Sequence, residues 1–576
     1  MTESATPRIV TRPVPEGALA DAPENLSPLL ERIFLSRGLT SGRELDKNLS
    51  ALARPAALPD IDKAADRLAA AVMSGEHILI VGDFDADGAT SVALSVSLLE
   101  AMGAERVSFL VPNRFEFGYG LSPEIVDLAL AETPAVIVTV DNGTSSIDGV
   151  ARANAAGVDV IVTDHHLPGK ALPDTFALVN PTLTDSTFES PAMAGVGVIY
   201  YVLGAVRAAL KVAGWFENRP IPNLADWLDL VAVGTVADVV PLDRNNRVMV
   251  SQGIRRIRGG RARPGIVALC EIAGRRADRL SAQDLGFAIG PRLNAAGRLD
   301  DMTLGIQCLL ANDLVQAREL ATALDELNRA RRALEQEMVQ DAELIVAAHD
   351  QAVDGRYGVA VYDPSWHQGV VGIVAGRLKE KIHRPVIAFA EAGAAAPDEL
   401  KGSARSLPGL HIRDVLDHVA SRYPGLIIRF GGHAMAAGLS IKRVHYPRFE
   451  KIFDELVAEH LPDEALSPVL ESDGELPVEE MTLEMAHQLA EAGPWGQQFP
   501  EPLFHDRFEL VSQRIVGEHH LKMVLKKGER LFDAIAFRQP ALGDTRRVLA
   551  AYRLEANEYR DRVTLQLVVQ HLAPLT

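Results

Sequence analysis

Three aspartates fall within five residues directly after an apolar run. Asp83, Asp85 and Asp87 belong to VGDFDADGATS, which follows HILIV and precedes helix-forming sequence. In doubly wound sheets the residues just after the strands are where ligands bind. Carboxylates gathered this closely repel one another and raise each other's pKa unless a cation neutralises them. The stretch therefore predicts a divalent metal site.

Acidic and imidazole side chains also follow three further apolar runs. Asp141 follows AVIVTV in DNG, the triplet Asp164, His165 and His166 follows VIVT, and Asp238 follows VAVGTVA, which we interpret as another strand. A single Asp after a strand is usually a helix cap, and a lone His is usually structural. Acidic or imidazole side chains after four separate apolar runs are better explained by one metal site than by four independent structural roles. Oxygen ligands with one or two imidazoles favour Mn²⁺ or Mg²⁺ over an ion that prefers thiolates.

The elements that must position these side chains can be predicted from the apolar pattern. Short apolar runs alternate with amphipathic helical stretches from about residue 60 to 310, which predicts an α/β domain around a parallel sheet buried on both faces. The expected strands are HILIV, RVSFLVP, AVIVTVDNG, VDVIVTDHH, FALVN and LVAVGTVADVV. Apolar residues keep helical spacing over 311–349, which predicts a long connecting helix.

Two further domains are expected after this helix. RYGVAVYD and RPVIAFA predict strands of a smaller α/β domain around the helix GVVGIVAGRLKEK, and alternating β segments beyond residue 477 predict a small antiparallel barrel. The predicted organisation is an N-terminal extension 1–50, a catalytic domain 51–310, a connecting helix 311–349, a second domain 350–462 and a barrel domain 463–576.

Composition limits the classes of function. With 576 residues, 47% of them apolar, the chain is expected to be a soluble cytoplasmic protein of several domains, without a membrane-spanning run. Cys270 and Cys308 lie in apolar helical surroundings and are interpreted as buried structural thiols. The net charge of -19 argues against a nucleic-acid partner. This argument is weaker than the total suggests, because binding depends on the local electrostatic field and the chain has basic clusters at 254–264, 274–279, 328–332 and 525–530.

The motifs in their order along the chain resemble a known superfamily. GDFDADGATS, VDNG, TDHH and GTVADVVPL resemble the four motifs of the DHH phosphoesterases. VPNRFEFGYGL, GPRLNAAGR, GSARS, RFGGHAMAAG and GPWGQQFPEPLF resemble the RecJ family of single-strand-specific 5′ to 3′ DNA exonucleases. The resemblance covers the chain from about residue 50 to its C-terminus. Phe84 departs from the more usual tyrosine of this motif, while every metal-binding carboxylate and both histidines are present.

This resemblance implies a DHH catalytic domain, a DHHA1 domain and an oligonucleotide-binding (OB) barrel, and a two-metal hydrolase that uses Mn²⁺ or Mg²⁺. The metal ligands it implies are Asp83, Asp85, Asp87, Asp141, His165 and Asp238. Asp141 is expected to bridge the two ions, and Asp83 is the weakest assignment because neighbouring carboxylates in one turn cannot all face the same ion. His166 is expected to face the phosphate or to orient a ligand, and Asp164 to hold an imidazole or to cap a helix.

Phosphate also requires cations, and planar guanidinium groups bind it in two-point fashion. The residues expected to act in catalysis are Asp85, Asp141, His166, Arg298, Arg405 and His433. Those expected to contact DNA or phosphate are Arg114, Tyr119, Arg292, Asn294, Arg298, Ser403, Arg405, Gly431, Gly432, His433, Lys526 and Lys527. Tyr119 would stack on a base, and the two glycines would let backbone amides approach a phosphate.

Other functions remain open at this stage. An oligoribonuclease or cyclic-dinucleotide phosphodiesterase of the same superfamily explains the metal residues but not the last hundred or so residues, and a pyrophosphatase needs no barrel. A non-catalytic DNA-binding scaffold would be expected to have lost part of the carboxylate set. The expected substrate is single-stranded DNA, met in a cleft between the two α/β domains. A single-strand DNA-binding protein and a helicase are further expected partners, and the chain is expected to be a monomer.

Overall fold

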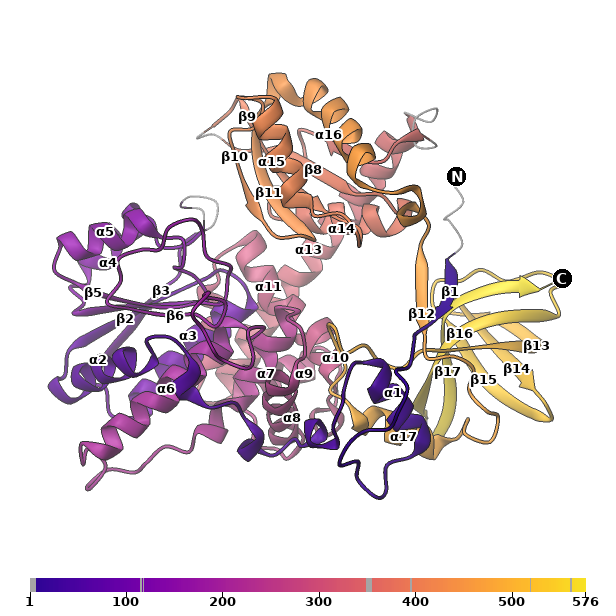
Figure 1. The fold of residues 1–576 in the computed structure, drawn as a ribbon, viewed down its shortest axis with the longest axis horizontal. Coiled ribbons are helices and arrows are strands. Elements are labelled where there is room, and N and C mark those ends of the chain that lie inside the picture. Colours follow the sequence, from indigo (N-terminus) through magenta and orange to yellow (C-terminus); the bar gives the residue numbers. More distant parts are fainter. Residues whose placement is uncertain are drawn as a thin grey trace. The chain divides into compact units, whose positions relative to one another are not determined.

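The chain folds into two compact units in a computed structural model that describes residues 7–113, 117, 119–348, 355–393, 396–517, 519–559 and 562–575. The large unit consists of Thr11–Asn328 and Ser472–Thr576, and the small unit consists of Met1–Val10 and Arg329–Glu471 (Figure 1). The long helix α13 (Leu314–Ala348) confirms the predicted connecting helix, and the division of the chain into two units falls within it, between Asn328 and Arg329.

The large unit contains a parallel five-stranded sheet of order β3-β2-β4-β5-β6. Its strands are β2 (His77–Gly82), β3 (Arg106–Leu110), β4 (Val136–Val140), β5 (Asp159–Thr163) and β6 (Ala177–Val179). Every residue of β2 and β4 is buried, as a Val- and Ile-rich strand in the middle of a two-sided parallel sheet requires. After β3 the chain returns to the other side of β2, so a topological switch point lies between β2 and β4, where such folds bind ligands.

Helices cover both faces of this sheet. The helices along the strands are α2 (Ile61–Ser74), α3 (Ala86–Ala101), α4 (Pro123–Ala131), α5 (Ile147–Ala155) and α6 (Gly195–Val212). A helical layer continues the unit with α7 (Leu228–Ala237), α8 (Arg244–Arg258), α9 (Pro264–Ile272), α10 (Ala282–Asp284), the π-helical segment η6 (Leu285–Ile289), α11 (Gly290–Leu299) and α12 (Thr303–Leu310). Cys270 and Cys308 are buried and free, which confirms the prediction of structural thiols.

One expected strand is a helix. LVAVGTVADVV forms α7 and not a strand, so Asp238 caps the C-terminus of a helix. A continuous apolar run cannot be assigned by periodicity when all sides are buried, and α7 packs against α3, α6 and α8. At Gly234 an added Cβ would lie 2.3 Å from Thr90 Oγ1, so this glycine permits the close approach of α7 to α3.

The helix α6 is long and apolar enough to cross a membrane by composition, with a mean hydropathy of 1.5 over 18 residues. It is 61% buried and packs against α2, α3 and α7. We therefore interpret it as a core helix.

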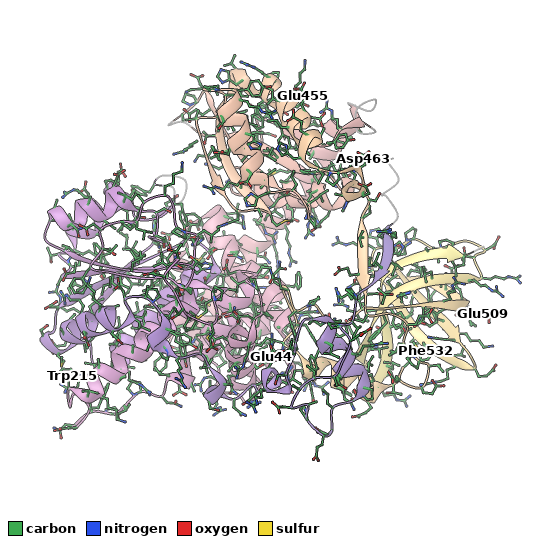
Figure 2. All side chains as sticks on the ribbon, in the orientation of Figure 1. Glu44, Trp215, Glu455, Asp463, Glu509 and Phe532 are labelled. Carbon is green, nitrogen blue, oxygen red and sulfur yellow. The ribbon has the colours of Figure 1, made fainter. Side chains whose placement is uncertain are left out.

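The C-terminal part of the large unit is a closed barrel of order β13-β14-β15-β17-β16. Its strands are β13 (Phe504–Val516), β14 (His520–Lys527), β15 (Arg530–Ala536), β16 (Arg547–Tyr559) and β17 (Arg562–Leu575). The side chains alternate between the interior, as for the buried Phe532, and solvent, as for the exposed Glu509 (Figure 2). The predicted barrel is confirmed, although β15 and β17 pair in parallel and the barrel is therefore not wholly antiparallel.

The small unit contains a mixed sheet of order β10-β11-β9-β8-β7. Its strands are β7 (Val359–Tyr362), β8 (Val386–Glu391), β9 (Glu399–Arg405), β10 (Arg429–Gly432) and β11 (Ala436–Lys442), and its helices are α14 (Val371–Ile382), α15 (Ile412–Arg422) and α16 (Tyr446–His460). The predicted strands of RYGVAVYD and RPVIAFA are β7 and β8. The ribbon β1 (Arg8–Thr11) with β12 (Val469–Ser472) and the helices α1 (Pro28–Ser36) and α17 (Leu483–Ala492) complete the chain.

Candidate metal centre and phosphate-binding residues

The carboxyl ends of β2, β4 and β5 bring the acidic motifs together. Val81 is in register with Thr139, and Val140 is in register with Thr163, so the residues after these three strands emerge at one level. Three groups of ligand atoms lie within 4.8 Å of one another there: Asp83 with Asp85 and Asp141; Asp87 with His165 and Asp238; Asp141 with His165 and His166. Asp141 and His165 each belong to two of the three groups.

The turn after β2 orients its aspartates in different directions. The Oδ1 atom of Asp85 caps α3 by accepting hydrogen bonds from the amides of Asp87 at 2.9 Å and Gly88 at 3.0 Å. Asp87 instead points to the N-terminus of α6, where its two oxygens accept from the amides of Gly195 at 2.6 Å and Val196 at 2.9 Å. The positive end of the α6 dipole thus holds this carboxylate.

Each residue of the motif DNG has a different role in the turn after β4. Asp141 adopts a left-handed backbone conformation with φ 63°, which short polar residues tolerate better than others. Asn142 donates to Val81 O at 3.2 Å and Val140 O at 2.9 Å and thereby ties the ends of β2 and β4 together. Gly143 has φ 115°, so the turn requires glycine there. Asn142 lies within the motif VDNG, but its role in joining two strand ends depends on the tertiary structure.

The imidazole of His165 faces the carboxylates. Its Nε2 lies 3.1 Å from Asp141 Oδ1, 3.5 Å from Asp238 Oδ2 and 3.9 Å from Asp87 Oδ2. Asp238 reaches this point from the end of α7, so a helix and three strands contribute to one centre. The residues present therefore fit a divalent ion that prefers oxygen ligands with one imidazole.

The electrostatics of the cluster also favour a cation. Burial, then the charges of neighbouring aspartates, raise the pKa of Asp141 and of Asp238 well above the ordinary value. Burial and the charge of Asp85 raise the pKa of Asp87 to about 7, against the amides of α6. Each of these carboxylates is disfavoured in its charged form, and a bound divalent cation would remove that penalty.

Asp164 organises the DHH turn. Its Oδ1 accepts from the amide of His165 at 2.7 Å and from Nδ1 of His166 at 2.8 Å, and its Oδ2 accepts from the amide of Thr144 at 2.9 Å. Although burial opposes it, these contacts and the neighbouring imidazoles lower the pKa of Asp164. Of the two roles considered for Asp164, the structure has the one that holds an imidazole.

His166 and Tyr119 lie next to each other beside the carboxylates. The hydroxyl of Tyr119 lies 3.0 Å from Nδ1 of His166 and donates to Asp141 O at 3.2 Å. Burial lowers the pKa of His166, but the hydrogen bond to Asp164 and the charges of Asp164, Asp83 and Asp85 outweigh it and raise this pKa to about 9. Tyr119 as a whole residue is 49% exposed.

The helix α11 supports the metal-binding turn. Asn294 Oδ1 accepts from the amide of Ala86 at 2.8 Å, and a Cβ at Gly297 would lie 1.8 Å from Phe84 O. Asn294 therefore holds the aspartate turn from behind, and Arg298 lies half-buried in the last turn of the same helix.

Two of the predicted DNA-binding cations are engaged elsewhere in the structure. Arg292 is buried, with Nη2 at 2.8 Å from Asp325 Oδ1, and ties α11 to α13. The ammonium of Lys527 is paired with the buried carboxylate of Asp506. These contacts give each cation an internal partner that local sequence could not reveal, and the expected DNA contacts of Arg292 and Lys527 stay predictions. Arg114 lies outside the described residues.

The motifs GSARS and GGHAMAAG meet at one end of the sheet of the small unit. Ala436 is in register with Arg405 and Gly438 with Ser403, so the turn that carries His433 lies beside the end of β9. Gly432 has φ 139°, and a Cβ there would lie 2.5 Å from Ala436 O, so Gly432 shapes the turn. Gly431 has open space around it, and His433 is exposed.

Arg405 is a half-buried cation without an acidic partner among the described residues. Its Nη1 donates to Ser403 Oγ at 3.1 Å and Ala404 O at 2.8 Å, and burial lowers its pKa. Its Nη2 would lie 2.9 Å from a Cβ at Gly372, in the first turn of α14. A guanidinium, a hydroxyl and a helix N-terminus at one place can bind an anion such as phosphate.

Comparison with known proteins identifies the family. Family models match for the DHH family N-terminal domain over residues 77–235, the DHHA1 domain over 354–459 and the RecJ OB domain over 472–571. The chain is 52% identical to the single-stranded-DNA-specific exonuclease RecJ of Salmonella typhimurium, over 96% of this chain and 97% of the relative, and 51% identical to that of Escherichia coli, over 96% and 97%.

The fold agrees with a solved structure. The crystal structure of RecJ from Thermus thermophilus in complex with Mn²⁺ superposes with a TM-score of 0.81 at 29% identity, covering 100% of this chain and 80% of that chain. Similarity over nearly the whole length, with all three domains in order, leaves one assignment: the chain belongs to the RecJ family of single-stranded-DNA-specific exonucleases.

Proposed function

We propose that the protein is a metal-dependent exonuclease that degrades single-stranded DNA from its 5′ end and releases mononucleotides, in DNA recombination and repair. The observation that carries this proposal is the convergence of Asp83, Asp85, Asp87, Asp141, His165 and Asp238 on one centre, in a chain similar to RecJ over almost its whole length. We also propose that it acts in the cytoplasm as a monomer, with a single-strand DNA-binding protein and a helicase as partners.

Two divalent ions, Mn²⁺ or Mg²⁺, are the proposed cofactors. Asp83, Asp85 and Asp141 would hold one ion, and Asp87, Asp141, His165 and Asp238 would hold the other. When bound, such a pair activates a water molecule and neutralises the oxygens around phosphorus in an in-line displacement.

The side chains beside the carboxylates would bind and orient the phosphate. Asp164 fixes the ring of His166 and favours its protonated form, so the imidazolium can pair with a phosphate oxygen. Tyr119 contacts His166 and is half-exposed, so it can meet the terminal base.

The small unit would supply further phosphate contacts. Arg405 is already desolvated and has no carboxylate partner among the described residues, so an anion can bind it without first breaking an ion pair. Ser403 and His433 lie at the same end of the sheet and extend this surface. On the barrel, Lys526 stands opposite Glu509 in the strand pair and is the proposed DNA contact.

Single-stranded DNA labelled at either end tests the proposal. The full chain should shorten the strand from its 5′ end with Mn²⁺ or Mg²⁺, stop when EDTA is added, and leave blunt duplex largely intact. Digestion from the 3′ end would contradict the proposed direction. A preference for short oligoribonucleotides or cyclic dinucleotides would assign the site to another phosphodiesterase, and metal-independent binding without hydrolysis would favour a scaffold.

A further inference from the structure

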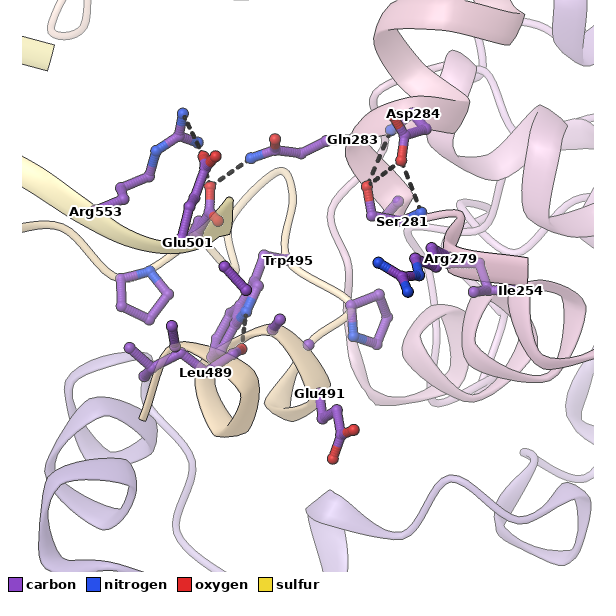
Figure 3. A pocket seen from close by; sticks show the side chains of 18 of the residues that line it. Ile254, Arg279, Ser281, Gln283, Asp284, Leu489, Glu491, Trp495, Glu501 and Arg553 are labelled. Carbon is purple, nitrogen blue, oxygen red and sulfur yellow. Dashed lines mark hydrogen bonds and ion pairs between the residues drawn. The ribbon is translucent and has the colours of Figure 1, made fainter. Parts of the chain in front are cut away.

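A pocket of about 850 Å³ lies within the large unit (Figure 3), and the residues that line it are not the metal-binding residues. One wall comes from α8 and from the residues just before α10, where Ile254, Arg279 and Ser281 lie. The opposite wall comes from α17, the loop after it and β16, where Leu489, Trp495 and Arg553 lie. None of the carboxylates and imidazoles of the candidate metal centre lines it.

Cationic side chains outnumber carboxylates in the lining of this pocket. Arg255 and Arg258 project from the last turn of α8, are exposed, and form no ion pair with any residue that the structure describes, although Nε of Arg258 donates to Leu280 O at 2.7 Å. Three of the four carboxylates in the lining lie close to an arginine, because Glu501 pairs with Arg553, Glu555 lies 3.7 Å from Arg553 and Asp284 lies 3.2 Å from Arg275. A chain with a net charge of -19 thus has a local excess of arginine here.

Lys47 strengthens this excess of positive charge. Its ammonium donates to Glu491 O at 2.8 Å and Ala492 O at 3.3 Å, at the C-terminus of α17. Burial first, then the charges of Arg247, Arg255 and Arg258, lower its pKa to about 8 against the opposing effect of Glu491. Cations that destabilise one another in this way are poised to bind an anion.

Exposed aromatic rings border the same pocket. Phe287 is 78% exposed and Phe537 is 59% exposed, and they are the phenylalanines with the greatest exposure among the described residues. Phe287 belongs to the π-helical segment η6, and π turns occur often at functional sites. An exposed ring beside unpaired arginines can stack on a nucleic-acid base while the arginines bind the phosphates on either side.

We propose that this pocket binds a segment of the single-stranded DNA substrate that lies internal to the end being cleaved. The phosphates contact Arg255, Arg258 and Lys47, and the bases stack on Phe287 and Phe537. The proposal rests on the proposed function, because it takes single-stranded DNA as the substrate. The rings favour DNA over an acidic peptide, whose carboxylates would gain the arginines but leave both flat faces exposed.

The test compares full-length variants whose altered side chains are exposed and do not contact the metal centre. Arg255→Ala/Arg258→Ala removes the cations, Phe287→Ala/Phe537→Ala removes the rings, and Arg106→Ala/Lys211→Ala is a matched control that removes two exposed cations outside the pocket. Binding of labelled oligothymidylates of about 5 and about 40 nucleotides is measured in EDTA, lengths chosen to bracket the ~4–16 nucleotides that one OB fold covers.

The arginine variant should bind the longer strand about tenfold more weakly, and its slope of log affinity against log salt should fall by about 1.4, or about 0.7 for each lost phosphate contact. The phenylalanine variant should lose a similar factor without a change in slope, since stacking on a base carries no charge. Binding and Mn²⁺-dependent cleavage of the short strand should match the unaltered protein in both.

Unchanged affinity and salt slope for the longer strand in both variants would overturn the proposal, as would an equal loss in the control. A labelled poly-glutamate peptide is measured in parallel. If the arginine variant loses peptide binding but keeps its affinity for DNA, the pocket belongs to a protein partner. If the unaltered protein does not hydrolyse single-stranded DNA at all, the proposed function fails independently of these binding results.

Discussion

At the scale of the residue, Asp141 combines three properties that structural aspartates seldom share. It is buried, it has a left-handed backbone, and its pKa is raised by burial and by four neighbouring aspartates. A left-handed residue other than glycine costs about 1–2 kcal/mol. A fold that retains both the strain and the repulsion at one position does so for function and not for stability.

We expect Asp141→Asn to abolish hydrolysis and to leave the fold intact. Asparagine keeps the size and tolerates the left-handed backbone, but it removes the charge that both proposed ion positions share. Activity should fall by more than about a hundredfold, because loss of a residue that only supports a metal ligand already costs up to about a hundredfold. The melting temperature of the metal-free protein should not fall, because the substitution removes a carboxylate that neighbouring aspartates repel. Activity within tenfold of the original would remove Asp141 from the centre.

We expect Arg405→Lys to reduce turnover despite the conserved charge. An ammonium cannot reproduce the two-point contact of a guanidinium with phosphate, and it cannot also donate to Ser403 Oγ and Ala404 O in the same geometry. Steady-state kinetics on single-stranded DNA should show a loss of about tenfold or more in kcat/KM, equivalent to about 1.4 kcal/mol. Unchanged kinetics would make Arg405 a surface cation without a role in binding.

At the scale of the element, the metal centre depends on how closely helices approach the strand ends. The N-terminus of α6 lies against Asp141 and Asp87, and α11 lies against the carbonyl of Phe84. Glycine makes both approaches possible, at Gly195 and at Gly297. The helices therefore help to orient the carboxylates that follow β2 and β4 toward one centre.

We expect Gly195→Ala to weaken metal binding and stability together. The added Cβ would lie 2.6 Å from Asp141 Cβ and 2.8 Å from its Cα, so α6 must shift and its amides must leave Asp87. Overpacking of this kind costs about 1–3 kcal/mol. Gly204→Ala, in the same helix, is the matched control, because its nearest neighbour is a leucine methyl group at 3.4 Å. Calorimetric titration with Mn²⁺ should separate the two variants, and equal affinities would contradict the proposed role of α6.

At the scale of the whole molecule, the barrel is not an appendage of the catalytic part. One continuous hydrophobic cluster runs from the parallel sheet into the barrel within the large unit. Trp495 and Phe499 stack on each other, with ring centroids 5.0 Å apart, and both stack on Phe34 of α1. Deletion of the barrel would expose this core, so its contribution to DNA binding is better measured with point substitutions such as those at Arg255 and Phe287.

We expect divalent metal to stabilise the protein more as the pH rises. Asp87, Asp141 and Asp238 have raised pKa values in the folded, metal-free protein, so the stability they contribute is full below pH ~4 and is lost as the pH rises through the raised pKa of each group, which is about 7 for Asp87. Metal displaces those protons and restores stability. The Mn²⁺-induced rise in melting temperature should be larger at about pH 8 than at about pH 6, and smaller in Asp141→Asn. An equal rise at both values would contradict this account.

The sequence by itself determined the features that depend on local pattern. The Val- and Ile-rich strands β2, β4 and β5, the helix α13 and the barrel all follow from periodicity, and the aspartates after β2 and β4 could be placed at one edge because parallel strands end together.

Only the tertiary structure decided the features that depend on distant neighbours. It made the apolar run before Asp238 a helix, because burial on every side hides the periodicity. It engaged Arg292 with Asp325 and Lys527 with Asp506, and it turned Asn294 toward the amide of Ala86. The physical reason is the same in each case: the partner of a charged or polar group lies far away in the chain, and the residue type alone does not specify which partner packing will bring to it.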